Sequence, residues 1–297
     1  MKRVIISALI VLGLAACESE PSRLDVDINE GIVHNVEVSL DGTTRATSDK
    51  GFDLENIAST DYELRYILEI YLNGATHSQT ILYTNETSVS IPVRLAPERE
   101  YRIVVWADLV ERVVNDERDM TQDYDRYYET SNGLRAIEVL GNWVAMDESR
   151  DAYTDYVDVV GYSSTTDIKL ELTRPFSKIR IVTTDVADAT ATPKSVEVSY
   201  LRIPTMYDAY TATASNLVPK SATIDIDLSS PVYTDETNEL TLYTDYIFAD
   251  NEHSDVDLSI DIKDENNATI KSHDLSDIKT KRNMLTTLKG KFLTNGN

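Results

Sequence analysis

The sequence has little of the chemistry on which catalytic and metal sites depend: one cysteine, four histidines and ten glycines in 297 residues. Without a second cysteine no disulfide can form within the chain, so a hydrophobic core must support the fold. No Gly-x-Ser-x-Gly, His-Glu-x-x-His or glycine-rich phosphate motif occurs. The histidines are too scattered for two of them to share a metal ion: His34, His77, His253 and His273. We therefore expect no enzyme, no metal and no cofactor.

Basic residues are scarce as well, with 28 lysines and arginines against 51 aspartates and glutamates and a net charge of −23. Such a chain repels phosphates, which argues against nucleic acid and against electrostatic docking on anionic lipids. Three Asp-x-Asp pairs resemble calcium ligands or paired catalytic carboxylates: Asp25/Asp27, Asp225/Asp227 and Asp255/Asp257. Residues i and i+2 of a strand share one face, so a solvated acidic sheet surface is the favoured interpretation.

Long apolar runs are missing except at the N-terminus. Residues 4–14 are apolar or small and follow the basic start Met1-Lys2-Arg3. Eleven residues suit the hydrophobic region of a secretory signal and are too few for a bilayer, which needs about 20. The run ends in Leu14-Ala15-Ala16-Cys17, small residues before the only cysteine of the chain.

This ending resembles the lipobox of bacterial lipoproteins. The resemblance implies a signal peptide of residues 1–16, cleavage after Ala16, and a lipid on Cys17 that anchors the chain in the outer membrane. An uncleaved N-terminal membrane anchor is the alternative. The acidic cluster Glu18-Ser19-Glu20 resembles a tag that carries some lipoproteins to the outer leaflet, which implies surface exposure; the inner leaflet is the other possibility. Residues 17–31 would form a lipidated, flexible tail.

The dominant hydrophobic period downstream is two, which predicts β-strands. In "YELRYILEIYL" (62–72) Leu64, Leu68 and their even-numbered neighbours share one face, and Glu63, Arg65 and Glu69 the other. "TSVSIPVRL", "YRIVVWAD", "TDIKLELT", "SATIDIDL" and "DVDLSIDIK" alternate similarly. Pro92 indicates an edge strand, and "DENNA" (264–268) a hairpin turn. Strands with one apolar face must pack in pairs of sheets, so we predict an all-β fold of two tandem antiparallel β-sandwiches.

A weakly periodic stretch separates the two groups of strands. Residues 111–163 are rich in Asp, Glu, Arg and Tyr and predict an excursion of loops and one or two short helices. We assign it to an N-terminal sandwich of residues 32–165, followed by a C-terminal sandwich of residues 166–297. No Pro/Gly/Ser-rich linker lies between them, so we expect the domains to share an interface.

Three stretches resemble the fimbrillin-like outer-membrane lipoproteins of Gram-negative anaerobes: "YRIVVWADLV" (101–110), "LTRPFSKIRIVTTD" (172–185) and "KRNMLTTLKGKFLT" (281–294). The last has the pattern Arg-Asn-x-Leu-Thr-Thr-x-x-Gly-x-Phe-Leu-Thr. Within that group the chain looks closest to an uncharacterised subgroup with two immunoglobulin- or transthyretin-like sandwiches. The resemblance implies a surface lipoprotein related to pilus subunits or adhesins, with other pilus subunits or surface glycans and proteins as partners.

Pilins of this family assemble by strand exchange, after a protease cuts behind an arginine that follows the first strand. Here "VHNVEVSL" (33–40) is a plausible first strand, and Arg45 follows it in a polar segment of the kind that proteases cut. Cleavage at Arg45 and its absence both stay open. A donor strand needs an extension beyond the last strand, and only "NGN" follows Thr294, so a tip, anchor or non-polymerising role is expected rather than a stalk.

The excursion offers the best candidate binding surface, because aromatic faces beside Asp, Asn and Arg suit a sugar or a protein partner. Its candidate residues are Tyr124, Arg126, Tyr127, Tyr128, Trp143, Tyr153 and Tyr156. The alternative is that these rings form a small core beneath the loops. We expect a non-catalytic surface lipoprotein with an adhesive or structural role; a glycan-binding lipoprotein of a carbohydrate-uptake system is the second possibility.

Overall fold

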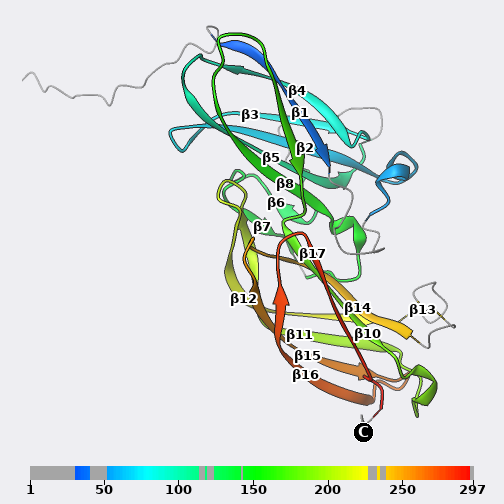
Figure 1. Cartoon of the computed structure of the whole chain (residues 1–297). Helices are drawn as coiled ribbons and strands as arrows, with labels where there is room; N and C mark the ends of the chain where they lie inside the picture. Colours follow the sequence, from blue (N-terminus) through cyan, green and yellow to red (C-terminus); the bar gives the residue numbers. More distant parts are fainter. Residues whose placement is uncertain are drawn as a thin grey trace, which may run out of the picture.

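The computed structural model describes residues 31–40, 52–113, 118, 124–141, 143–226, 233–234 and 239–294. Nearly all of this part is β-structure, as the sequence predicts, arranged as two β-sandwiches (Figure 1). The helical segments are single 3₁₀ turns or little more: η2 (Leu54–Ser59), η4 (Glu148–Arg150) and η5 (Val186–Asp188). The predicted tandem sandwich fold is confirmed.

The first sandwich has a three-stranded and a four-stranded sheet. The smaller sheet has the order β4-β1-β9 and the larger one β3-β2-β5-β8. Their strands are β1 (Ile32–Leu40), β2 (Tyr62–Leu72), β3 (Ala75–Thr84), β4 (Ser88–Leu95), β5 (Glu100–Glu111), β8 (Ala152–Val160) and β9 (Asp167–Leu172). Pro92 lies in β4, which is an edge strand as expected. Between the sheets, Val36, Leu68, Ile103 and Leu172 belong to one buried cluster.

The second sandwich pairs a sheet β13-β14-β10-β17 with a sheet β16-β15-β11-β7-β6, in which β12 also pairs with β11. Its strands are β6 (Tyr128–Glu129), β7 (Ile137–Val139), β10 (Phe176–Thr183), β11 (Ser195–Asp208), β12 (Thr213–Asp225), β13 (Tyr233–Thr234), β14 (Glu239–Phe248), β15 (Ser254–Lys263), β16 (Thr269–Thr280) and β17 (Met284–Gly290). The predicted hairpin at 264–268 joins β15 to β16, where the Asp264 carboxylate accepts the backbone N–H groups of Asn266 and Ala268.

The division of the chain between the sandwiches differs from the predicted domain boundaries. The strand β9, which we placed at the start of the second sandwich, pairs in parallel with β1 of the first. Its apolar residues Ile168, Leu170 and Leu172 face the first core. Alternation identifies a strand and its buried face but not the sheet that it joins, and a parallel partner distant in sequence leaves no local signal.

The excursion differs from its prediction too. Its last part is the regular strand β8, which completes the larger sheet of the first sandwich beside β5. Its short strands β6 and β7 extend a sheet of the second sandwich instead, through β11. The excursion therefore belongs to both sandwiches, although we assigned it to the first alone. Figure 1 shows β6 and β7 lying between the two sandwiches.

Candidate functional site

A third apolar cluster, which we call the junction, joins the two sandwiches. It combines outward-facing residues of the first sandwich with residues of the excursion and the second sandwich: Ile67, Tyr71, Val104, Trp106, Tyr128, Leu134, Ile137, Ala152, Phe176, Tyr207, Ala209, Ala212, Tyr246 and Phe248. The Phe176 and Phe248 rings stack with their centroids 5.0 Å apart, and Tyr128 stacks on Phe176 at 5.6 Å. A buried apolar interface of this kind fixes two domains relative to each other.

The junction also buries charge on the face of β2 that alternation alone would leave in solvent. Arg65 is 1 % exposed and donates two hydrogen bonds to Asp108 of β5 and one, of 2.6 Å, to Asp125 of the excursion. Burial opposes the charge of Arg65, but the two carboxylates outweigh it and raise the guanidinium pKa above its ordinary value. Because Asp125 also accepts the hydroxyl and backbone N–H of Thr130, Arg65 fastens the excursion to the first sandwich.

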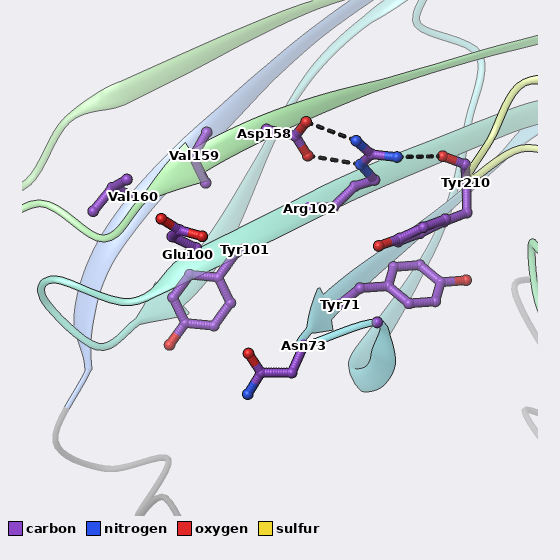
Figure 2. Close-up of a pocket in the computed structure, with 10 residues that line it drawn as sticks. Tyr71, Asn73, Glu100, Tyr101, Arg102, Asp158, Val159, Val160 and Tyr210 are labelled. Carbon is purple, nitrogen blue, oxygen red and sulfur yellow. Dashed lines mark hydrogen bonds and ion pairs between the residues drawn. The ribbon is translucent and has the colours of Figure 1, made fainter.

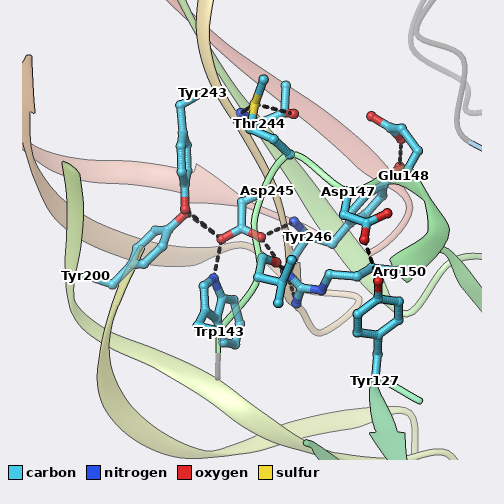
Figure 3. Close-up of polar contacts among 12 residues, drawn as sticks. Tyr127, Trp143, Asp147, Glu148, Arg150, Tyr200, Tyr243, Thr244, Asp245 and Tyr246 are labelled. Carbon is cyan, nitrogen blue, oxygen red and sulfur yellow. Dashed lines mark hydrogen bonds and ion pairs between the residues drawn. The ribbon is translucent and has the colours of Figure 1, made fainter. Parts of the chain in front are cut away.

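A second buried network surrounds Asp245 of β14 (Figure 3). Its carboxylate accepts hydrogen bonds from Arg150 at 2.7 Å, from the Trp143 indole at 2.6 Å, and from the hydroxyls of Tyr200 and Tyr243. Asp245 and Arg150 are 1 % exposed. Arg150 belongs to η4 of the excursion, so this network fastens the excursion to the second sandwich.

A third network crosses between the sandwiches directly. Arg174, just before β10, donates to both carboxylate oxygens of Asp151, at 2.6 and 2.5 Å, and to the hydroxyl of Tyr153 at 2.9 Å. Burial lowers the pKa of Arg174, and the charge of Asp151 more than offsets this, so the pKa is raised. Arg282, before β17, donates to the backbone carbonyls of Arg174 and Thr154. Two arginines of the second sandwich thus bind the N-terminal end of β8 and the residue before it.

One buried carboxylate, that of Asp185, binds the segment that follows β17. Asp185 is fully buried and accepts the backbone N–H groups of Leu293 and Thr294 together with the hydroxyls of Thr183 and Thr294. Burial raises the pKa of Asp185, but these hydrogen bonds outweigh it and hold the pKa below its ordinary value. Asp185 therefore fixes the chain after β17 against the end of β10.

The aromatic residues predicted as a binding surface divide between the surface and the core. Tyr128 and Tyr153 are 1 % exposed and Trp143 is 8 % exposed, so they are core residues, as in the alternative that we considered for them. Tyr124, Arg126, Tyr127 and Tyr156 are half-buried. Of these, Arg126 and Tyr127 lie together, with the guanidinium carbon 4.3 Å from the ring centroid, whereas Tyr156 contacts Arg102 elsewhere.

An open pocket of about 440 Å³ lies at the edge of the junction (Figure 2). The β2–β3 turn (Asn73, Gly74), the start of β5 (Glu100 to Arg102), the end of β8 (Asp158 to Val160) and Tyr210 of the β11–β12 turn line it. None of these residues was singled out from the sequence. They come from four separate segments, and only pairing of β2, β5 and β8 brings them together.

Several of the other residues predicted from the sequence lie outside the described residues: Ala16, Cys17, Asp25, Asp27, Arg45 and Asp227. Within the described residues no three His, Cys, Asp or Glu side chains converge to hold a metal ion. Asp255 and Asp257 lie on β15, where Asp255 pairs with Lys279 and Asp257 accepts the backbone N–H of Asp277. In the same part of the chain, no helix is long and apolar enough to cross a membrane.

The fold and the junction define a class of protein: two β-sandwiches joined into one body by a buried polar and apolar interface. Residues 23–297 match the model of the family of unknown function DUF6562, and the chain belongs to this family. No curated protein matches it. Among solved structures it is similar to the fimbrial anchor protein Mfa2 from Porphyromonas gingivalis, with 10 % identity, a TM-score of 0.46 and 82 % of each chain covered. It is also similar to a fimbrial assembly protein from Parabacteroides distasonis, with 9 % identity, a TM-score of 0.47, and 90 % of this chain and 94 % of that one covered.

Proposed function

We propose that this protein is a non-catalytic, adhesive component of the bacterial surface, anchored in the outer membrane by a lipid on Cys17. One observation carries the proposal. Two of the three stretches that resemble fimbrillin-like lipoproteins, residues 172–185 and 281–294, interlock in the structure. The same two stretches also reach the first sandwich, because Arg174 binds Asp151 and Arg282 donates to the backbone carbonyl of Thr154.

The interlocking has two ends. At one end Arg282 donates to the carbonyl of Arg174, and the backbone N–H of Asn283 donates to the carbonyl of Phe176 at 2.7 Å. At the other end Asp185 binds Leu293 and Thr294. Between them β17 runs parallel to β10. A body fixed in this way presents a surface of constant shape, which suits attachment.

Within this function we propose a tip, anchor or non-polymerising role, with Arg45 left uncut. Cutting there would break the covalent link between β1 and the rest of the fold, and strand exchange would then require β1 to leave its place between β4 and β9. Val36 and Val38 of β1 are at most 1 % exposed in the first core, and His34 is fully buried. Its loss would open this core and leave two strand edges unpaired.

Three measurements test the proposal. Cells grown with radioactive palmitate should label the wild-type protein but not Cys17→Ser, and deletion of the gene should reduce attachment of the cells to host or bacterial surfaces. N-terminal sequencing of the surface form should find a blocked terminus at Cys17. A chain that begins at Ala46 would contradict the uncut form, and unchanged attachment would contradict the adhesive role.

A second candidate function is glycan capture for a carbohydrate-uptake system, and the open pocket at the junction favours it. The two functions separate in growth experiments. A deletion strain that attaches normally but grows more slowly on a polysaccharide would support capture, whereas lost attachment with normal growth would support adhesion.

A further inference from the structure

The pocket at the edge of the junction has a rigid wall. Arg102 donates to both carboxylate oxygens of Asp158, at 2.6 and 2.7 Å, and to the backbone carbonyl of Tyr210 at 2.8 Å. Its guanidinium carbon lies 4.2 Å from the Tyr156 ring centroid and 4.6 Å from that of Tyr210. The rings of Tyr71 and Tyr210 pack edge to face, with their centroids 4.8 Å apart. These contacts hold the β11–β12 turn of the second sandwich over the sheet of the first, so the pocket has a preformed shape.

Three polar groups that line the pocket are available to hydrogen-bond a ligand. The Glu100 carboxylate, the Asn73 amide and the Tyr210 hydroxyl all belong to lining residues and make no hydrogen bond or ion pair with another described side chain or backbone group. In Figure 2 the Asn73 side chain and the Glu100 carboxylate lie on either side of the Tyr101 ring. Asn73 is fixed by its backbone, because it and Gly74 form the β2–β3 turn with φ angles of 52° and 78°.

The available groups form a definite chemical set. Glu100 accepts hydrogen bonds, the Asn73 amide donates and accepts, and the Tyr210 hydroxyl does both. Val160, 49 % exposed, adds an apolar surface beside them. Hydroxyl groups on a ring with apolar C–H faces complement this set, and the volume of about 440 Å³ lies within the usual range of small-molecule sites, about 300–1,000 Å³.

The charge of the pocket further restricts the class of ligand that it can bind. The positive charge of Arg102 is neutralised by Asp158, so Glu100 leaves the pocket with a net negative charge. The chain as a whole carries −23. An anionic sugar would therefore meet repulsion from the pocket and from the protein around it.

We propose that this pocket binds a neutral saccharide unit, with Glu100, Asn73 and Tyr210 as its hydrogen-bonding residues. The proposal rests on the proposed surface function and names the ligand class of that function. Arg102 and Asp158 are positioning residues: they hold the wall in place, and the proposal assigns them no hydrogen bond to the sugar.

Saturation-transfer NMR with the detergent-solubilised full chain tests the proposal. The probes are methyl glycosides of neutral hexoses and N-acetylhexosamines, with glucuronic acid and sialic acid as anionic comparators. Glu100→Gln replaces the carboxylate with a neutral amide that has one acceptor oxygen instead of two, and Tyr210→Phe removes the hydroxyl. Glu265→Gln, at the exposed tip of the β15–β16 hairpin, is a charge-matched control. We expect neutral probes to bind, and each pocket variant to weaken binding about three- to tenfold, because one hydrogen bond contributes about 0.5–1.5 kcal/mol. The control and all melting temperatures should be unchanged.

The pocket assignment is overturned if no neutral probe binds, if the anionic sugars bind better, or if both pocket variants bind like the wild type. The surface function is judged separately, by attachment of cells. Cells that carry Glu100→Gln and attach normally while the deletion strain does not would overturn the pocket and leave the adhesive function standing. A deletion strain that attaches normally would overturn the adhesive function itself.

Discussion

The ion pair between Arg174 and Asp151 allows a direct test of how firmly the two sandwiches are joined. Arg174 is 4 % exposed and Asp151 fully buried, and two hydrogen bonds join them. Replacing either partner alone leaves the other as a buried charge without its counter-ion, which costs about 3–5 kcal/mol. Arg174→Leu and Asp151→Leu should therefore each lower the free energy of unfolding by about that amount.

The double variant should cost far less than the two single variants together, because it leaves no unpaired charge and apolar residues often replace a buried pair without loss. The assay is urea unfolding followed by tryptophan fluorescence. The chain has two tryptophans: Trp106 is fully buried in the junction and Trp143 belongs to the core of the second sandwich. Versions with only one of them, made by Trp→Phe replacement, report the two regions separately.

In the wild type both tryptophans should report one transition with the same midpoint, and the single variants should shift both. Two well-separated transitions in the wild type would refute the reasoning, because they would show that the sandwiches unfold independently. So would single variants that each cost less than about 1 kcal/mol, the value typical of exposed ion pairs.

Three further outcomes follow from the same contacts. The pKa of Asp185 is lowered in the folded state, so its contribution to stability is present above the unfolded pKa of about 3.9 and is lost as pH falls through the folded pKa. Asp185→Asn removes this contribution and should make the free energy of unfolding less dependent on pH in the acid range. Burial raises the pKa of Tyr66 and Tyr128, so stability is full below the unfolded pKa of about 10 and falls as pH rises above it, and spectrophotometric titration should show these phenols ionising only with unfolding. A chain that begins at Ala46 should unfold at a lower temperature and with a smaller enthalpy than the full chain in calorimetry, because it lacks β1, and an unchanged thermogram would contradict the central place of that strand.

The strands and their core faces could be predicted from the sequence because alternation is a local signal. In β2 the face with Leu64 and Leu68 was identified correctly, and both residues are fully buried. The opposite face was not: Arg65 and Glu69 are 1 % and 2 % exposed. A charged residue that alternates with apolar ones is expected to face solvent. Nothing near Arg65 or Glu69 in the sequence shows that distant segments will cover them and supply their hydrogen-bond partners.

The same limit applies to the candidate site. The predicted binding surface was drawn from aromatic residues that are close in sequence, yet Tyr128 and Tyr153 are core residues of different clusters. The pocket that the structure shows draws on Asn73, Glu100 and Tyr210, from three separate turns and strand ends. Its signal lies in the pairing of strands, and a single sequence does not reveal which strands pair.

The position of β1 has a mechanical consequence for a protein tethered by its N-terminus. Residues 32–39 pair with β4 and residues 35–40 with β9, and these two ladders overlap along most of the strand. A pull on the lipid anchor that we propose at Cys17 would reach the described fold at the N-terminal end of β1, and we consider a pull directed along the strand. Hydrogen bonds on both edges then bear the load in parallel and must shear together, instead of opening one at a time. Under such a pull, the ladders of β1 with β4 and β9 would be the first part of the described fold to carry the load.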